Sequence, residues 1–418
     1  MNDETPLAQR SLTDGADAPA PDPALADYAA DAERWFEENT PGDPGFLLPL
    51  SFLEVGTDEQ FSFLRDWQQK VYEAGYLGAN WPEAYGGRGL PQAYQDAATA
   101  AMRRARAPIM LNAIGLNWAG PLLLDMGTEE DRLTHLRPIL SGESIWCQGF
   151  SEPDHGSDLG SAQLRAVRDG DEYVLNGSKI WTTLGNYADH MILLARTSND
   201  APSRYAGLSF FLISMRTPGI ETVPIRKLTG EYGFTQTFFT DVRVPAAALM
   251  GEEGQGWLIA MRTLEYERGA RGGQPGGYSM TGFDMDDVVA LARRTMRGGR
   301  PAIEDPAIHD ELTALMIEAE GLRLNKRREA ITPLTADHPM ALPLGSKLLW
   351  SELAHRVGDL AMRITGADAG YYVGDEKAPD GGLWTRTYLN SFAATIGGGT
   401  SEVQRNIVGE HVLGLPKG

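Results

Sequence analysis

Apolar residues recur at helical spacing through the N-terminal part of the chain. The stretches 31–40 (DAERWFEENT), 58–78 (DEQFSFLRDWQQKVYEAGYLG) and 129–140 (EEDRLTHLRPIL) place apolar residues three and four positions apart, which is typical of amphipathic helices. The stretch 80–90 (NWPEAYGGRGL) interrupts this pattern with proline and glycine and predicts a loop. We therefore predict an N-terminal helical domain over residues 27–143.

The pattern changes between residues 144 and 255. Short runs of branched and aromatic residues, bounded by turn residues, predict the strands of a small sheet or barrel. These runs are 170–183, 188–198, 207–215, 219–225 and 235–245. Asn176 and Gly177 lie between two apolar runs and predict a hairpin turn. From residue 256 long helical patterns return, which predicts a second helical domain over 256–418.

Composition narrows the class of protein. The chain has 418 residues, of which 42% are hydrophobic and 22% charged, as in a globular protein with more than one core. Residues 1–26 are rich in Ala, Pro and Asp and predict a disordered leader. A net charge of -20 argues against nucleic acid as a partner. No apolar run reaches the roughly 18 residues of a membrane span, and the single cysteine, Cys147, is expected to be buried in packing and suits a reducing, cytoplasmic compartment.

Two basic clusters stand out against the acidic background, at 293–300 (RRTMRGGR) and 322–329 (LRLNKRRE). Each is either a solvated helix face or the rim of a pocket for a phosphate-bearing ligand, because local positive charge can override the global sign.

Aromatic and hydroxyl residues gather in two stretches. The segment 147–161 joins the first helical region to the β region, and the segment 179–189 places Trp181, Thr182 and Thr183 at the end of a strand. A large aromatic ring beside two hydroxyls suits a planar heteroaromatic ligand. Spacing alone supports ordinary packing equally well.

Three glycines, 397–399, precede the last helical segment. Ser401 and Gln404 predict a capping box that opens this helix. Glycines in front of a helix indicate unusual backbone geometry or the close approach of another group.

Together these stretches resemble the acyl-CoA dehydrogenase family. Six motifs occur in the family's order: NWPEAYGG, ILSGESIWCQGFSEPDHGSDL, NGSKIWTT, MRTPGIETVPIRKLTGEYGFTQTFFTDVRVP, GEEGQGW and GGGTSEVQRNIV. The resemblance covers nearly the whole chain after residue 26. It implies a mainly α fold with a β domain: an N-terminal α-helical domain, a middle β-barrel or sheet domain, and a C-terminal four-helix bundle.

The resemblance also implies FAD between the β domain and the bundle. By position, the implied cofactor contacts are Phe150, Ser151, Trp181, Thr182, Thr183, Thr400 and Glu402. Ser157, Gly398 and Gly399 are implied to lie near the substrate, and no metal is implied.

The family's usual catalytic base is missing. Most members read Tyr-Glu-Gly-Thr where this chain reads Gly-Gly-Gly-Thr over 397–400, so Gly398 replaces the glutamate that removes the α-proton. The family's second solution places the base on the helix that follows GEEGQGW. In this chain Glu267 continues the apolar stripe formed by Trp257, Ala260, Met261 and Leu264. We therefore expect Glu267 to be the base. The alternatives are a salt bridge to Arg268 or Arg271, or simple exposure near the end of the helix.

Contacts that family members usually lend to a neighbouring subunit's FAD are altered. Thr295 and Pro306 stand near the family's Arg and Gln positions, and Arg363 stands near the Gln of its Gln-x-x-Gly-Gly loop. An α2β2 heterotetramer with a related subunit would supply these contacts. A homo-oligomer that uses Arg294, Arg297 or Arg363 in their place is the alternative.

The resemblance thus implies FAD-dependent α,β-dehydrogenation of an acyl-CoA with a bulky or branched acyl group, and electron-transfer flavoprotein as the acceptor. Two alternatives remain open: an oxygen-using flavoenzyme of the same fold, either an oxidase or a monooxygenase, and a partner subunit of a heteromeric dehydrogenase.

Overall fold

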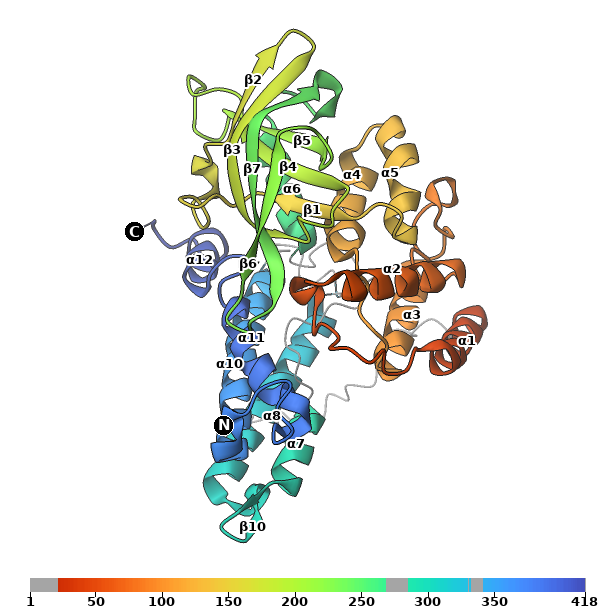
Figure 1. The fold of residues 1–418 in the computed structure, drawn as a ribbon, viewed down its shortest axis with the longest axis vertical. Coiled ribbons are helices and arrows are strands. Elements are labelled where there is room, and N and C mark those ends of the chain that lie inside the picture. Colours follow the sequence, from red (N-terminus) through yellow and green to blue (C-terminus); the bar gives the residue numbers. More distant parts are fainter. Residues whose placement is uncertain (1–21, 268–284, 330, 332–340, 418) are drawn as a thin grey trace, which may run out of the picture.

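The computed structural model describes residues 22–267, 285–329, 331 and 341–417. Helices of the N-terminal part, a β domain and a C-terminal group of helices follow one another along the chain (Figure 1). The predicted fold class, mainly α with a β domain, is confirmed. Within the described ranges, no helix combines the length and apolarity that crossing a bilayer requires.

The N-terminal helices are α1 (Pro23–Asn39), α2 (Asp58–Glu73), α3 (Gln92–Arg104), α4 (Gly120–Met126) and α5 (Glu129–Ser141). Helix α1 begins inside the stretch expected to be a disordered leader. Pro23 occupies its first turn, and the Asp22 side chain accepts a hydrogen bond from the backbone N–H of Ala24 at 3.0 Å. Both features favour helix initiation at this point.

The β domain contains β1 (Trp146–Gly149), β2 (Arg165–Asp169), β3 (Glu172–Thr183), β4 (His190–Arg196), β5 (Leu208–Ser214), β6 (Ile220–Arg226), β7 (Tyr232–Pro245) and β8 (Leu249–Met250). The strand order is β6-β7-β3-β2-β4-β5-β8, and β1 pairs in parallel with β4.

The hairpin predicted at Asn176-Gly177 is wrong, because β3 runs through both residues. Gly177 has a φ of +142°, and the pairing of β3 with β7 shifts register between Leu175 and Gly177, so this position is a β-bulge. The Asn176 side chain donates to Asp241 Oδ1 at 3.1 Å on β7 and accepts from the Asp241 N–H at 3.0 Å. Pairing with a distant strand therefore overrides the local turn signal.

The C-terminal part contains α6 (Gly256–Glu267), α7 (Met285–Arg294), α8 (Pro306–Glu329), α10 (Ala341–Thr365), α11 (Leu383–Ala394) and α12 (Ser401–Ile407). A short hairpin, β9 (Met296–Arg297) and β10 (Arg300–Pro301), connects α7 to α8. Helices α7, α8, α10 and α11 share one core, to which they contribute Leu291, Leu315, Leu360 and Trp384 respectively. These four helices form the predicted bundle.

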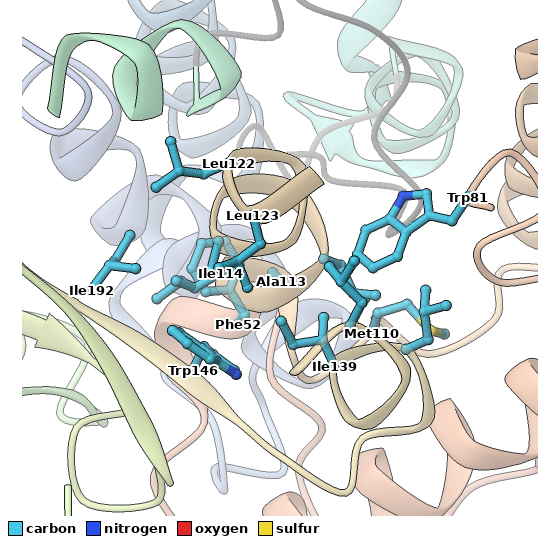
Figure 2. Close-up of a cluster of buried hydrophobic side chains, with 14 of the residues drawn as sticks. Phe52, Trp81, Met110, Ala113, Ile114, Leu122, Leu123, Ile139, Trp146 and Ile192 are labelled. Atoms are coloured by element: carbon cyan, nitrogen blue, oxygen red, sulfur yellow. The ribbon is translucent and has the colours of Figure 1, made fainter. Parts of the chain in front are cut away.

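Helix α6 packs elsewhere. Its Ile259 and Ala260 belong to the large core that the N-terminal helices share with the sheet. Trp146 of β1, Ile192 of β4 and Leu122 of α4 belong to the same core (Figure 2). The N-terminal helices, the sheet and α6 therefore form one body.

The β6–β7 hairpin joins that body to the bundle by reaching α11 (Figure 1). At its tip Lys227 Nζ donates to Glu54 Oε1 at 2.7 Å and to Asn390 Oδ1 of α11 at 2.9 Å. Arg386 of α11 also pairs with Glu231 of the hairpin. Since Lys227 and Glu54 are buried, loss of either would leave an uncompensated charge.

Candidate active site

The segment that follows β1 is fastened to the end of β3 by a buried lysine. Lys179 is 0% exposed, and its Nζ donates to Glu152 Oε1 at 2.8 Å and to the Phe150 carbonyl at 2.9 Å. The N–H of Ile180 donates to the Ser151 carbonyl at 2.9 Å. Phe150 and Ser151 are thereby held beside the end of the strand that carries Trp181.

Electrostatics keep this buried pair together. Burial lowers the pKa of Lys179 to about 8, and the attraction of Glu152 opposes that effect. Burial alone would raise the pKa of Glu152, but Lys179 and the N–H groups of Leu164 and Gln163 together lower it. Those two N–H groups donate to the Glu152 carboxylate at 2.8 and 2.6 Å. The carboxylate is therefore satisfied on both oxygens.

Trp181 is held in a strained and exposed position. Its φ is +60°, its side chain is 55% exposed, and the register between β3 and β7 shifts between Lys179 and Thr182. Its ring meets the ring of Phe234 edge-on at 5.8 Å between centroids. Strained backbone outside glycine gathers at functional sites, so this exposed indole is a candidate ligand contact.

The residues around Trp181 differ in accessibility. Thr183 is 7% exposed, whereas Thr182 is fully enclosed and its carbonyl accepts from Thr235 Oγ1 at 3.2 Å. Ser151 is half-buried, and Phe150 is buried edge-on against Phe210. A ligand at this strand end would therefore meet Trp181 first, whereas the Thr182 side chain faces the interior.

Ser157 lies exposed in the loop after Phe150–Glu152. Its neighbour Asp158 pairs with Arg204 at 3.0 Å, which braces the loop. Cys147 is buried on β1, and burial raises the pKa of its thiol, so it is a packing residue.

The turn at 397–399 has two successive left-handed glycines, Gly398 with a φ of +67° and Gly399 with a φ of +92°. Gln404 Nε2 donates to the Gly398 carbonyl at 2.8 Å, and Lys347 Nζ of α10 donates to the Gly399 carbonyl at 2.5 Å. Two buried side chains from different helices thus fix this turn.

The predicted capping box at Ser401 is wrong by one residue. Thr400 is the cap of α12, because its Oγ1 accepts from the N–H of Val403 at 3.2 Å. Gln404 binds the Gly398 carbonyl and does not reach back to the cap. Glu402 is exposed in the first turn, where its own N–H and the Thr400 side chain lower the pKa of its carboxyl group.

The side chain of Glu267, which belongs to α6, lies next to this turn. It is the last residue of α6 and is half-buried. A Cβ atom built on Gly398 would lie 3.2 Å from Glu267 Oε1 and 3.7 Å from Lys347 Cε. The Glu267 carboxylate therefore lies where a side chain at position 398 would begin.

The rest of α6 follows the predicted stripe. Ala260 is buried, and Trp257, Met261 and Leu264 pack against the large core. Glu265 points elsewhere and pairs with Arg262 at 3.1 Å. The alternative partners of Glu267, Arg268 and Arg271, lie outside the described residues.

The basic residues of the bundle take two different roles. Arg294 of the cluster 293–300 pairs with Asp380, and Arg363, which lies outside both clusters, pairs with Glu311 and Asp359. Arg297 and Arg300 line an open hollow at the β9–β10 hairpin. In the cluster 322–329, Arg323 and Lys326 pair with glutamates of α8 itself, as a solvated helix face does.

Comparison with known proteins shows the family of this chain. Residues 53–143, 147–242 and 254–413 match the N-terminal, middle and C-terminal domains of acyl-CoA dehydrogenase. Acyl-CoA dehydrogenase IpdE1 of Mycobacterium tuberculosis is 36% identical, with 94% of this chain and 98% of that protein covered.

Two solved structures have the same fold. A complex described as the Tcur3481-Tcur3483 steroid ACAD aligns with a TM-score of 0.78 at 29% identity, over 96% of this chain and 99% of that one. The ChsE4-ChsE5 complex from Mycobacterium tuberculosis aligns with a TM-score of 0.75 at 27% identity, over 96% and 99%. The chain therefore belongs to the acyl-CoA dehydrogenase family. It is an acyl-CoA dehydrogenase, an oxidoreductase that acts on CH–CH bonds.

Sequence reasoning missed two residues that shape the site, Lys179 and Lys347, and gave Gln404 a capping role in place of its bond to Gly398. A signal was available for the lysines, since each stands at the start of an apolar run, Ile180-Trp181 and 348–350 respectively. A charged residue in such a run is buried only with partners, but its partners lie far away in the sequence.

We predict that Lys179→Met lowers the free energy of unfolding by about 3–5 kcal/mol, because it strands the Glu152 carboxylate in the protein interior. Urea denaturation measures the loss. Lys377→Met, the same change at an exposed position, should stay within about 0.5 kcal/mol of the parent. Equal effects of the two substitutions would contradict the role given to the buried pair.

Proposed function

We propose that this acyl-CoA dehydrogenase uses FAD and that Glu267 removes the α-proton of its acyl-CoA substrate. The observation that carries the proposal is the meeting of the Glu267 carboxylate with Gly398. The usual glutamate is absent from the turn, and a carboxylate from α6 lies beside the vacated side-chain position. The proposed base lies on α6 instead of the turn, next to the side-chain position of residue 398.

The residues at the end of β3 fit a flavin. Trp181 offers an exposed aromatic face in strained backbone, and Thr183 and Ser151 offer hydroxyl groups next to it. Phe150 and the main chain at Thr182 complete this side of the proposed site, and Thr400 and Glu402 are the proposed cofactor contacts at the start of α12. When bound, FAD would accept the hydride from the substrate's β-carbon.

The residues of the chain itself perform the proton chemistry. Glu267 ends a helix whose inner face is apolar, and an apolar setting weakens the solvation of a carboxylate and strengthens it as a base. Hydrogen bonds to the thioester carbonyl would acidify the α-carbon. Gly398, Gly399 and Ser157 are the proposed substrate-side residues.

A bulky or branched acyl group fits a turn without side chains. Residues 397–399 present only backbone beside Glu267, which leaves more space than the family's usual tyrosine and glutamate. The name of one similar structure, the Tcur3481-Tcur3483 steroid ACAD, supports a large acyl group.

Assembly through the bundle is also proposed. Its helices expose several large apolar side chains: Met316, Ile317 and Leu324 of α8, Leu349 of α10 and Phe392 of α11. Exposed apolar residues in such number mark contact surfaces. Two of the similar structures are complexes of paired chains, which supports an α2β2 heterotetramer with a related subunit. A homo-oligomer is the alternative, and electron-transfer flavoprotein is the proposed acceptor.

The purified chain, alone or co-expressed with a related subunit, should show the visible absorbance of bound flavin. Trp181→Ala should reduce the flavin content because it removes the exposed aromatic face. Leu133→Ala, a change at a similarly exposed site on α5, should not reduce it. A colourless protein in both preparations, also after FAD is added, would show that the proposal is wrong.

Glu267→Gln should leave the flavin content unchanged and slow substrate-driven flavin bleaching by at least about 100-fold, since a positioned base contributes at least that much. Stopped-flow absorbance with 3-cyclohexylpropanoyl-CoA measures the rate, and butanoyl-CoA should react more slowly if the acyl site is large. Glu265→Gln is the matched control, because Glu265 pairs with Arg262. The base assignment fails if the two variants bleach at the same rate.

A comparison of Gly398→Ala with Gly366→Ala distinguishes the effect of backbone strain from the effect of crowding against Glu267. Both glycines have nearly the same φ, +67° and +68°, but only a methyl group at 398 would meet Glu267. Each variant should lose about 1–2 kcal/mol of stability from left-handed backbone strain. Only Gly398→Ala should slow bleaching, by about 10-fold or more, since small displacements of a reacting group are costly. A rate loss shared by both variants would refute the contact argument.

A further inference from the structure

Lys347 is a buried cation that the proposed chemistry leaves without a role. It lies on α10 with 6% of its surface exposed, directly before Leu348 and Leu349. Its Nζ donates to the Gly399 carbonyl at 2.5 Å. Burying an ammonium group is costly unless its position provides polar or charged neighbours. The position of this lysine therefore calls for an explanation.

The lysine and Glu267 both lie next to Gly398. The position of a Cβ atom on Gly398 is 3.7 Å from Lys347 Cε and 3.2 Å from Glu267 Oε1. A cation from α10 and a carboxylate from α6 thus flank one point of the turn. Because both atoms lie near the same point, Lys347 Cε and Glu267 Oε1 are less than about 7 Å apart, and a nearby opposite charge favours the ionised form of a carboxyl group.

Two side chains hold the turn through different kinds of hydrogen bond. Lys347 binds the Gly399 carbonyl with a charged donor, and Gln404 binds the Gly398 carbonyl with a neutral one at 2.8 Å. Both side chains are buried and both fix a glycine of left-handed conformation. Lys347, however, is the one that also brings charge to Glu267.

We propose that Lys347 is a positioning residue for Glu267: it holds the 397–399 turn clear of the carboxylate and keeps that carboxylate ionised, ready to accept a proton. This inference rests on the proposed role of Glu267 as the base. It gives the half-buried Glu267 carboxylate an opposite charge close to it.

Other charged groups near this place are engaged with one another. On α6, Glu265 pairs with Arg262, which also pairs with Asp125 of α4 at 3.3 Å. On α8, Glu329 accepts from Ser346 Oγ at 2.8 Å and pairs with Lys326 at 2.6 Å. On α12, Arg405 pairs with Glu352 of α10. Lys347 is a cation of the described residues that lies next to the same point of the turn as Glu267.

The test compares three variants in the pH profile of flavin bleaching by 3-cyclohexylpropanoyl-CoA. In Lys347→Met the pH of half-maximal rate should rise by about one pH unit, because the stabilising charge is lost. Lys347→Gln keeps a donor for the Gly399 carbonyl and should shift the profile in the same direction. Gln404→Leu removes a neutral bond to the same turn, so it should lower the rate without shifting the profile.

Lys377→Met is the control for the loss of an exposed lysine and should match the parent. Hydrogen–deuterium exchange of residues 395–404 gives a readout independent of activity. Exchange should be faster in Lys347→Met than in Lys377→Met, since the turn loses one of its two anchors. If Lys347→Met does not fold, Lys347→Gln, which retains a hydrogen-bond donor, still tests the effect of losing the positive charge.

The outcomes distinguish the two proposals. A shifted profile in both Lys347 variants and an unshifted one in Gln404→Leu supports the inference. The inference is overturned if the Lys347 variants leave the profile unchanged, or if Gln404→Leu shifts it equally. If Glu267→Gln already bleaches at the parent rate, the base assignment itself has failed, and that result is recognised before any Lys347 variant is made.

Discussion

The buried contact between the β6–β7 hairpin and α11 is the constraint on which the arrangement of the site depends. Lys227 of the hairpin joins Glu54 of the N-terminal part to Asn390 of the bundle. Glu54 also accepts from the N–H and the hydroxyl of Ser51, so its charge is fully engaged. Because these polar groups are enclosed, they permit few alternative geometries. The bundle is thereby held in one position against the sheet.

That position matters because the two halves of the proposed catalytic site belong to different cores. Helix α6 is anchored in the core of the N-terminal helices and the sheet through Ile259 and Ala260. The turn at 397–399 belongs to the bundle side, where Lys347 and Gln404 hold its carbonyls. Glu267 meets Gly398 only because both bodies are locked together. A carboxylate can therefore move to another helix while it serves the same point in space.

Glycine at 398 and glutamate at 267 depend on one another physically. The left-handed backbone of Gly398 is strained for any residue with a Cβ atom, and such an atom would crowd the Glu267 carboxylate at 3.2 Å. A second glutamate at position 398 would meet both obstacles and would place two like charges together. The glycine turn thus leaves room for the carboxylate on α6.

The strained backbone at Trp181 is also a consequence of buried contacts. Its positive φ and exposed ring exist because Lys179, just before it, is tied inward to Glu152 and Phe150. The strand must bulge between Lys179 and Thr182 to keep its pairing with β7. The energy of the buried ion pair and the sheet pairing offsets the local cost of one strained residue. The aromatic platform is therefore a product of the packing behind it.

The sequence by itself determined the kinds of element and their order, because the period of apolar residues is a local property that packing reinforces. It also determined that residue 398 has no carboxylate and that Glu267 continues the apolar stripe of its helix. Only the tertiary structure decided that Asn176-Gly177 is a bulge, that Thr182 faces inward and that Lys347, Gln404 and Glu267 converge on one turn. These outcomes depend on partners far apart along the chain. A buried charge or an unusual φ is stable only with such partners, and no local pattern specifies them.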